Sequence, residues 1–379
     1  MGRLHANLHR LRFAVTQMRL RGHTRAYVVV WQLLLATVLR GWRVLAQILN
    51  ARLVTPVFNS IRFAAFQQHL PVSELSRVYI VVMPCMLHFL LPCLALLHAR
   101  ASLVLVFNGA KAWERELLLQ RLPNVPMFRL NTLPGSSLSH GCVINLLLEQ
   151  HRGDFVIVDH DTYMFDPTML PRLRPTDCES VVGIFAQHSR AAGQSYPLTH
   201  LLGFNADALR QLMHRHSIDS SIYRTAPERL AGLLNRVGLG PRLYLKDYQD
   251  FHDTLHVLLA VAMAEGRPWR IEPMSEAMPV MHVGGTSIGS HHTKNLFALY
   301  IHMRFIELLD DPLIARRYAF VTYPLRNSVE ALQRCLPGDP DWQTLPVVNE
   351  LIQRLHSAGA GHGFRPGAQV SLNSTDGIR

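Results

Sequence analysis

The stretch Asp154-Phe-Val-Ile-Val-Asp-His-Asp-Thr-Tyr-Met-Phe-Asp-Pro167 decides the fold. Its apolar run, 155–158, is short and bounded by polar residues, which is typical of a buried central strand of a parallel sheet. Open α/β sheets bind ligands beyond the carboxyl ends of their strands. Asp159 and Asp161 follow this strand directly, so we predict that they hold a divalent cation, Mn²⁺ or Mg²⁺, on a diphosphate. His160, between them, is expected to be structural.

Three further strands precede this one. We expect them at 78–82, 103–107 and 127–130, alternating with helices that include 113–121 and 140–150. Strands that alternate with helices of this length form βαβ units with right-handed crossovers. The sequence therefore predicts an α/β fold whose Rossmann-type sheet is mostly parallel and has helices on both faces. After Pro167 the pattern is less regular, and 188–197 is expected to be a polar loop.

The positive charge is concentrated in the N-terminal part of the chain. The net charge is +11, yet residues 1–73 contain ten of the 38 Lys and Arg and no Asp or Glu, which leaves 28 basic and 27 acidic residues beyond. A nucleic-acid binder would carry its basic groups on the working domain. We therefore expect no nucleic-acid partner.

This N-terminal arm carries an apolar run, 26–39, followed by Arg40 and Arg43. The run is shorter than the roughly 20 residues that span a bilayer. Two interpretations stay open: a helix lying on an anionic membrane surface, or a helical hairpin packed on the protein itself. A transit peptide is a third, although serine is sparse. The five cysteines are widely spaced and predict free thiols in a reducing compartment. We expect a cytoplasmic protein, peripheral on the inner face of the cell membrane if the first interpretation holds.

Later polar residues complete a candidate site. His282 ends an extended segment before a glycine pair and is a candidate third metal ligand, and Lys294 could neutralise a leaving diphosphate. Asp250 and Asp253 stand where a long helix, 254–265, is expected to begin. Either is a candidate general base for an acceptor hydroxyl, and either also suits helix capping.

The earlier strand ends should hold the base and ribose of a nucleotide if the fourth strand holds its diphosphate. Asn108 follows the second strand, and His140 and Asn145 lie in the helix before the acidic strand. Each of the three also suits a turn or a helix cap.

The order of these parts resembles the GT-A-fold glycosyltransferases, especially the large inverting family of bacterial cell-surface enzymes. The resemblance covers about residues 76–300 and rests on Asp159-His160-Asp161, on the glycine and asparagine of 139–148, on 203–205, on the acidic helix ending in Gly266, and on His282. It implies that the loop after the first strand, which ends in Pro84, contacts the donor.

Two departures from that family bear on the site. The family's acid after the second strand is replaced by Asn108, and its Glu-Asp pair at the start of the acidic helix is absent. The chain also lacks the Gln-x-x-Arg-Trp signature of processive synthases, which favours addition of a single sugar.

The resemblance implies a metal-dependent, inverting, non-processive glycosyltransferase that uses a nucleotide sugar, expected to be a UDP-sugar, and a glycan, glycolipid or other hydroxyl acceptor. The alternatives are a nucleotidyltransferase that makes a sugar nucleotide and a catalytically inactive membrane-surface adaptor of the same fold. The predicted organisation is an arm (1–73), a catalytic domain (74–310), a helical extension (311–356) and a disordered tail (357–379).

Overall fold

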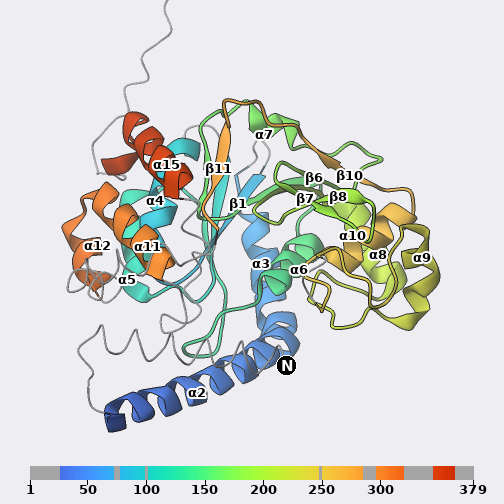
Figure 1. The fold of residues 1–379 in the computed structure, drawn as a ribbon, viewed down its shortest axis with the longest axis horizontal. Helices are drawn as coiled ribbons and strands as arrows, with labels where there is room; N and C mark the ends of the chain where they lie inside the picture. Colours follow the sequence, from blue (N-terminus) through green and yellow to red (C-terminus); the bar gives the residue numbers. More distant parts are fainter. Residues whose placement is uncertain are drawn as a thin grey trace, which may run out of the picture.

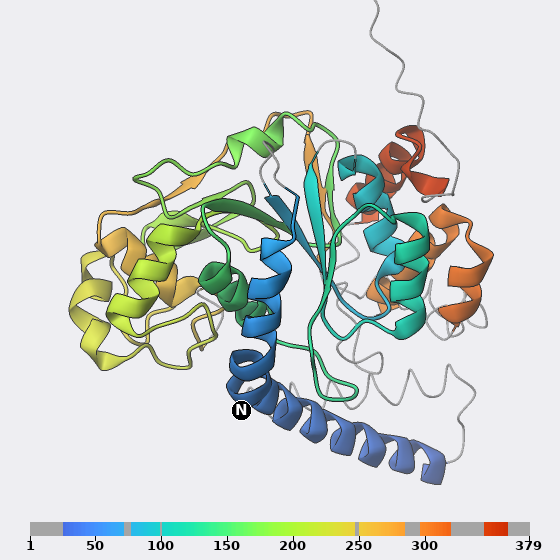
Figure 2. The ribbon, with the colours of Figure 1, turned by 180° about the vertical axis from the view of Figure 1, so that it is seen from behind.

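The computed structural model describes residues 26–71, 77–98, 101–246, 250–284, 296–319 and 345–362. Lys294 and most of the expected tail lie outside these residues. Figures 1 and 2 show a central sheet between two layers of helices, with helix α2 standing apart from both layers.

The central sheet has seven strands in the order β10-β6-β9-β4-β1-β2-β3. Strand β9 is antiparallel to both of its neighbours, while the other pairs are parallel. This arrangement confirms the predicted, mostly parallel sheet. The strands are β1 (Arg77–Val82), β2 (Ser102–Phe107), β3 (Met127–Arg129), β4 (Asp154–Val158), β6 (Val181–Gly183), β9 (Leu201–Asn205) and β10 (Trp269–Ile271).

Alternate residues of the central strands enter two separate cores. In β1, Val78 and Ile80 lie in one core, and Tyr79 and Val81 lie in the other. A strand places successive side chains on opposite faces, so a strand that is apolar throughout needs cover on both faces. Helices on both faces are thereby confirmed. One face carries α4 (Leu87–Leu97), α5 (Ala112–Arg121), α11 (Leu296–Leu309) and α15 (Leu345–Ser357), and the other carries α3 (Ser60–Gln68), α6 (His140–Gln150), α8 (Ala206–His216) and α10 (His256–Ala264).

Two small antiparallel sheets flank the central one. Strand β5 (Thr162–Met164) pairs with β11 (Val280–His282). Strands β7 (Ala186–Ser189) and β8 (Gln194–Pro197) form a hairpin where the sequence predicted a polar loop. That prediction was wrong because cross-strand pairing and a turn at Gly193, with φ of +64°, outweigh the polar composition. The remaining elements are short: α7 (Met169–Arg172), α9 (Ala231–Arg236), α12 (Pro312–Arg317), and the 3₁₀ turns η2 (Glu228–Leu230) and η5 (Ala360–His362).

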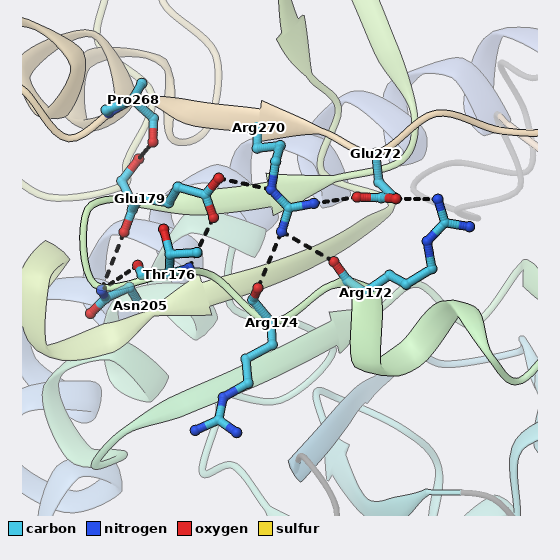
Figure 3. Close-up of polar contacts among 9 residues, drawn as sticks. Arg172, Arg174, Thr176, Glu179, Asn205, Pro268, Arg270 and Glu272 are labelled. Carbon is cyan, nitrogen blue, oxygen red and sulfur yellow. Dashed lines mark hydrogen bonds and ion pairs between the residues drawn. The ribbon is translucent and has the colours of Figure 1, made fainter.

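The backbone that directly follows α7 packs closely against β9. A Cβ atom at Gly203 would lie 1.7 Å from the carbonyl oxygen of Leu173, so only glycine fits there. Figure 3 shows the ion-pair network beside this contact. Buried Glu272 pairs with Arg172 and Arg270, and Arg270 also reaches Glu179 at 2.7 Å. The network holds the β10 edge of the sheet against the segment that follows α7.

The N-terminal part is a nearly continuous helical segment: α2 (Ala26–Leu49), the π-helix η1 (Asn50–Asn59) and α3. In α3, Phe63 is buried and packs edge-on against Phe128, with ring centroids 4.8 Å apart. In contrast, α2 projects away from the sheet in both views (Figures 1 and 2). Among the described residues, no helix combines the length and the apolar character needed to cross a membrane.

Candidate active site

Asp159 and His200 meet because β9 runs antiparallel to β4. The register pairs Val158 with Leu201, so the residue after β4 faces the residue before β9. The Asp159 amide donates to the His200 carbonyl at 2.9 Å. The His200 Nδ1 atom lies 3.3 Å from Oδ2 of Asp159. The backbone pairing therefore sets the two side chains side by side.

Asp161 and His282 meet through the second sheet. His282 is paired with Thr162 in the β5–β11 ladder, and the Val283 amide donates to the Asp161 carbonyl at 3.1 Å. This places Nε2 of His282 3.5 Å from Oδ1 of Asp161. Burial lowers the pKa of His282, but the hydrogen bond with Asp161 and the charges of Asp161 and Asp159 outweigh burial and raise it above its ordinary value.

These pairs join into one cluster. Ligand atoms of Asp159, His200 and His282 all lie within 4.8 Å of one another. The two imidazole rings stack with centroids 3.6 Å apart. Imidazole nitrogen is a ligand for transition ions, whereas carboxylate oxygen suits both Mn²⁺ and Mg²⁺. The described residues therefore fit a bound divalent cation. The structure brings the predicted ligands Asp159 and His282 together with His200, which was not predicted, and it places Asp161 beside His282 but outside this cluster of three.

His200 was not predicted from the sequence to be a site residue. The signal for it was weak: a histidine directly before a short apolar strand. It becomes informative only once that strand is known to pair antiparallel with the strand that ends at Asp159.

Two other histidines border the cluster. His140 begins α6, and its Nε2 lies 4.0 Å from Oδ1 of Asp159. The backbone there is organised by the helix cap Ser139, whose hydroxyl accepts from the Cys142 amide. His160 is buried, as expected of a structural residue, and its Nε2 has no hydrogen-bond partner among the described residues.

The predicted donor-binding asparagines are both held by backbone contacts. The Asn108 amide group donates to the Leu138 carbonyl at 2.9 Å and accepts from the Leu138 amide at 2.7 Å. Oδ1 of Asn145 accepts from the amide and the hydroxyl of Ser220. Each side chain therefore fixes a neighbouring loop at the carboxyl ends of the strands, and a direct donor contact stays a prediction.

Pro84 lies in the turn between β1 and α4, and a buried acid supports this turn. Glu114 of α5 is fully buried and accepts from the amides of Cys85 and Lys111, each at 2.7 Å, and from the Tyr318 hydroxyl. Cys85 has a φ of +64°, which is unfavourable for a residue with a side chain. The Glu114 carboxylate thus stabilises a strained turn beside the predicted donor position.

A cavity of about 350 Å³ opens beyond the ends of β2 and β3. Arg115 and Arg129 line it together with Gly109 and the loop 132–136. The same loop continues through Leu138, which Asn108 holds, to His140 beside Asp159. The cavity and the cluster of Asp159, His200 and His282 are therefore connected by one loop.

Asp253 lies in the segment that precedes α10. Its carboxylate pairs with Lys246, a residue the sequence analysis did not single out, and accepts from the Thr254 amide at 2.8 Å. Burial raises the pKa of Asp253, but these hydrogen bonds and the charges of Lys246 and His256 outweigh burial and lower it. Asp250 is exposed.

A chain of contacts links Asp253 to α6. A Cβ atom at Gly141 would lie 2.7 Å from the Ser220 carbonyl oxygen, so glycine there lets the segment around Ser220 approach the helix. That carbonyl accepts from the amide of Leu255, whose φ is +71°. Ser220 therefore stands between the first turn of α6, where His140 lies, and the backbone that carries Asp253.

Comparison with known families bears on these residues. The model of the StrH glycosyltransferase N-terminal domain matches residues 58–209. This segment includes Asp159, Asp161 and His200. The match confirms the predicted resemblance to glycosyltransferases, and with it the prediction of a transferase enzyme. The match covers less than half of the chain and ends before Asp253 and His282.

Solved structures with similar architecture include glycosyltransferases. The bifunctional glycosyltransferase WbbM is 9% identical, with a TM-score of 0.31 over 53% of this chain and 39% of its own. TarS 1–349 from S. aureus is 14% identical, with a TM-score of 0.33 over 76% and 88%. GlyE from Streptococcus pneumoniae is 10% identical, with a TM-score of 0.36 over 66% and 64%. No curated protein matches the chain.

Proposed function

We propose that this protein transfers one sugar from a nucleoside-diphosphate donor, expected to be a UDP-sugar, to an acceptor hydroxyl with inversion at the anomeric carbon. The observation that carries the proposal is the convergence of Asp159, His200 and His282, with Asp161 alongside, beyond the carboxyl end of β4. In open α/β sheets, ligands bind beyond the carboxyl ends of the strands. A cluster of metal-binding side chains at the end of β4 is therefore in the right place to bind the donor's diphosphate.

The metal cluster would hold the diphosphate end of the donor. Asp159, His200 and His282 would bind Mn²⁺ in preference to Mg²⁺, because two of the three ligands are imidazoles. A cation bound there would supply positive charge to the leaving diphosphate. The cavity beyond β2 and β3 has room for the nucleoside, and Arg115 and Arg129 supply positive charge to its wall.

Asp253 would act on the acceptor. Its pairing with Lys246 keeps the carboxylate ionised at neutral pH, which a proton acceptor requires. In the transfer, the acceptor oxygen would bond to the anomeric carbon as the carbon–diphosphate bond breaks, and the hydroxyl proton would pass to Asp253. Lys246 would hold Asp253 in place throughout.

The test combines binding with turnover. Calorimetric titration with UDP should show binding that is tighter with Mn²⁺ than with Mg²⁺. A panel of nucleotide sugars should then yield nucleoside diphosphate in the presence of an acceptor. Formation of a sugar nucleotide from a sugar phosphate and a nucleoside triphosphate would instead establish the nucleotidyltransferase alternative. Mn²⁺-independent UDP binding would contradict the metal role.

A further inference from the structure

The surface of α2 and η1 is unusually apolar for an exposed helix. Trp31 is 64% exposed, Val38 is 67% exposed, and Ile61 just beyond η1 is 70% exposed. Other large apolar side chains are exposed along the same segment: Val30, Leu34, Leu35, Leu39, Trp42, Val44, Leu45, Ile48, Leu53, Val57 and Phe58. A large group of exposed apolar side chains of this kind indicates a surface that binds a partner or a membrane.

This segment is fixed to the body at one end. Asn50 and Asn59, both fully buried, anchor η1 to the loop after β3. Asn50 accepts from the Leu133 amide and donates to Ser136, both at 2.9 Å. Asn59 accepts from the Asn131 amide at 2.7 Å and donates to its carbonyl at 3.0 Å.

The anchoring loop is also the wall of the cavity. Loop 132–136 lines the cavity beyond β2 and β3, and Trp42 of α2 donates to the Pro134 carbonyl at 3.0 Å. Helix α2 therefore lies beside the loop that follows the carboxyl end of β3. A surface bound by α2 would therefore lie near this loop and the cavity that it lines.

The charge of the segment selects the partner. The first 73 residues carry ten Arg and no acid, and two of these Arg, at 40 and 43, lie within α2 itself. Cationic residues are attracted to anionic head groups, and tryptophan favours the membrane interface.

We propose that α2 and η1 lie in the plane of an anionic phospholipid surface and hold the carboxyl edge of the sheet toward that surface. The apolar side chains insert at the level of the acyl chains, the positive charge of the segment attracts the anionic head groups, and the asparagine anchors set the orientation of the domain. This docking does not depend on the transfer reaction.

The experiment is co-sedimentation of the full chain with vesicles of mixed phosphatidylcholine and phosphatidylglycerol, compared with phosphatidylcholine alone. We expect binding to the anionic vesicles that weakens as salt is added. Replacing Trp31, Leu34 and Val38 by Ser should weaken it at least about tenfold. The matched control replaces Ile222 and Leu243, exposed apolar residues elsewhere, by Ser and should bind as the unaltered chain does.

All three substituted side chains are exposed, so the thermal midpoint should stay unchanged in the variant. Three outcomes would overturn the proposal: no binding to either vesicle, equal binding by the α2 variant, or a dimer in solution that the α2 substitutions convert to monomers without vesicle binding. The last would assign the patch to a second copy of the chain.

Discussion

The imidazole rings of His200 and His282 stack face to face at 3.6 Å, although the two residues come from different sheets. His200 arrives through the antiparallel pairing of β9 with β4, and His282 through the pairing of β11 with β5. Both pairings start from the chain around Asp159 and Asp161. The strand before the two acids, β4, therefore positions His200, and the strand after them, β5, positions His282.

Replacing His200 by Ala should weaken Mn²⁺ binding in the presence of UDP by more than about tenfold, since it removes one of three convergent ligands. Calorimetric titration measures this directly. His188→Ala, on exposed β7, is the matched control and should bind Mn²⁺ normally. Equal affinity in His200→Ala would remove His200 from the metal site and leave Asp159, Asp161 and His282 as the ligands.

Replacing Asp253 by Asn should reduce kcat by about 10²–10⁴-fold while Mn²⁺ and UDP binding stay unchanged, because the amide cannot accept the hydroxyl proton. Asp250→Asn tests the alternative base. Steady-state kinetics with saturating donor distinguish the two acids. A larger loss in Asp250→Asn than in Asp253→Asn would transfer the proposed role to Asp250.

Replacing Glu114 by Gln should lower the free energy of unfolding by roughly 2–3 kcal/mol, because a fully buried acceptor of three hydrogen bonds loses one acceptor oxygen. Urea denaturation measures the change. Glu116→Gln, on the exposed face of the same helix, should be within about 0.5 kcal/mol of the unaltered chain. Similar stability of the two variants would show that the turn at Cys85 needs no carboxylate.

The protein should lose stability as pH falls from 6.5 towards 4. Burial, together with the nearby charges of Arg77 and Arg210, lowers the pKa of His151 to about 4, and burial lowers that of His256 to about 3. In that window the unfolded chain binds protons that the folded chain does not. The free energy of unfolding therefore falls by up to about 1.4 kcal/mol per pH unit for each such group.

Urea denaturation at several pH values tests this, with His151→Gln as the informative variant. Glutamine can still bond the Tyr79 hydroxyl, which lies 2.9 Å from Nδ1 of His151, but it does not titrate. The variant should show a shallower pH dependence than the unaltered chain, and His188→Gln the original one. An unchanged slope in His151→Gln would contradict the assignment.

The sequence alone determined the features that depend on local patterning. Apolar runs bounded by polar residues located the first four strands, and α6 was predicted with the bounds observed. Asp159 and Asp161 followed from their place after a buried strand, because a parallel sheet binds ligands at that end. Functional residues that follow a single strand can therefore be predicted from the sequence.

Tertiary structure decided what depends on pairing between distant segments. No local sequence pattern predicts that 201–205 pairs antiparallel with 154–158. His200 could therefore not be assigned to the cluster from the sequence. The Lys246–Asp253 pair and the hairpin of β7 and β8 were missed for the same reason. Register is set by the summed burial and hydrogen bonding of two strands, and neither strand carries that information by itself.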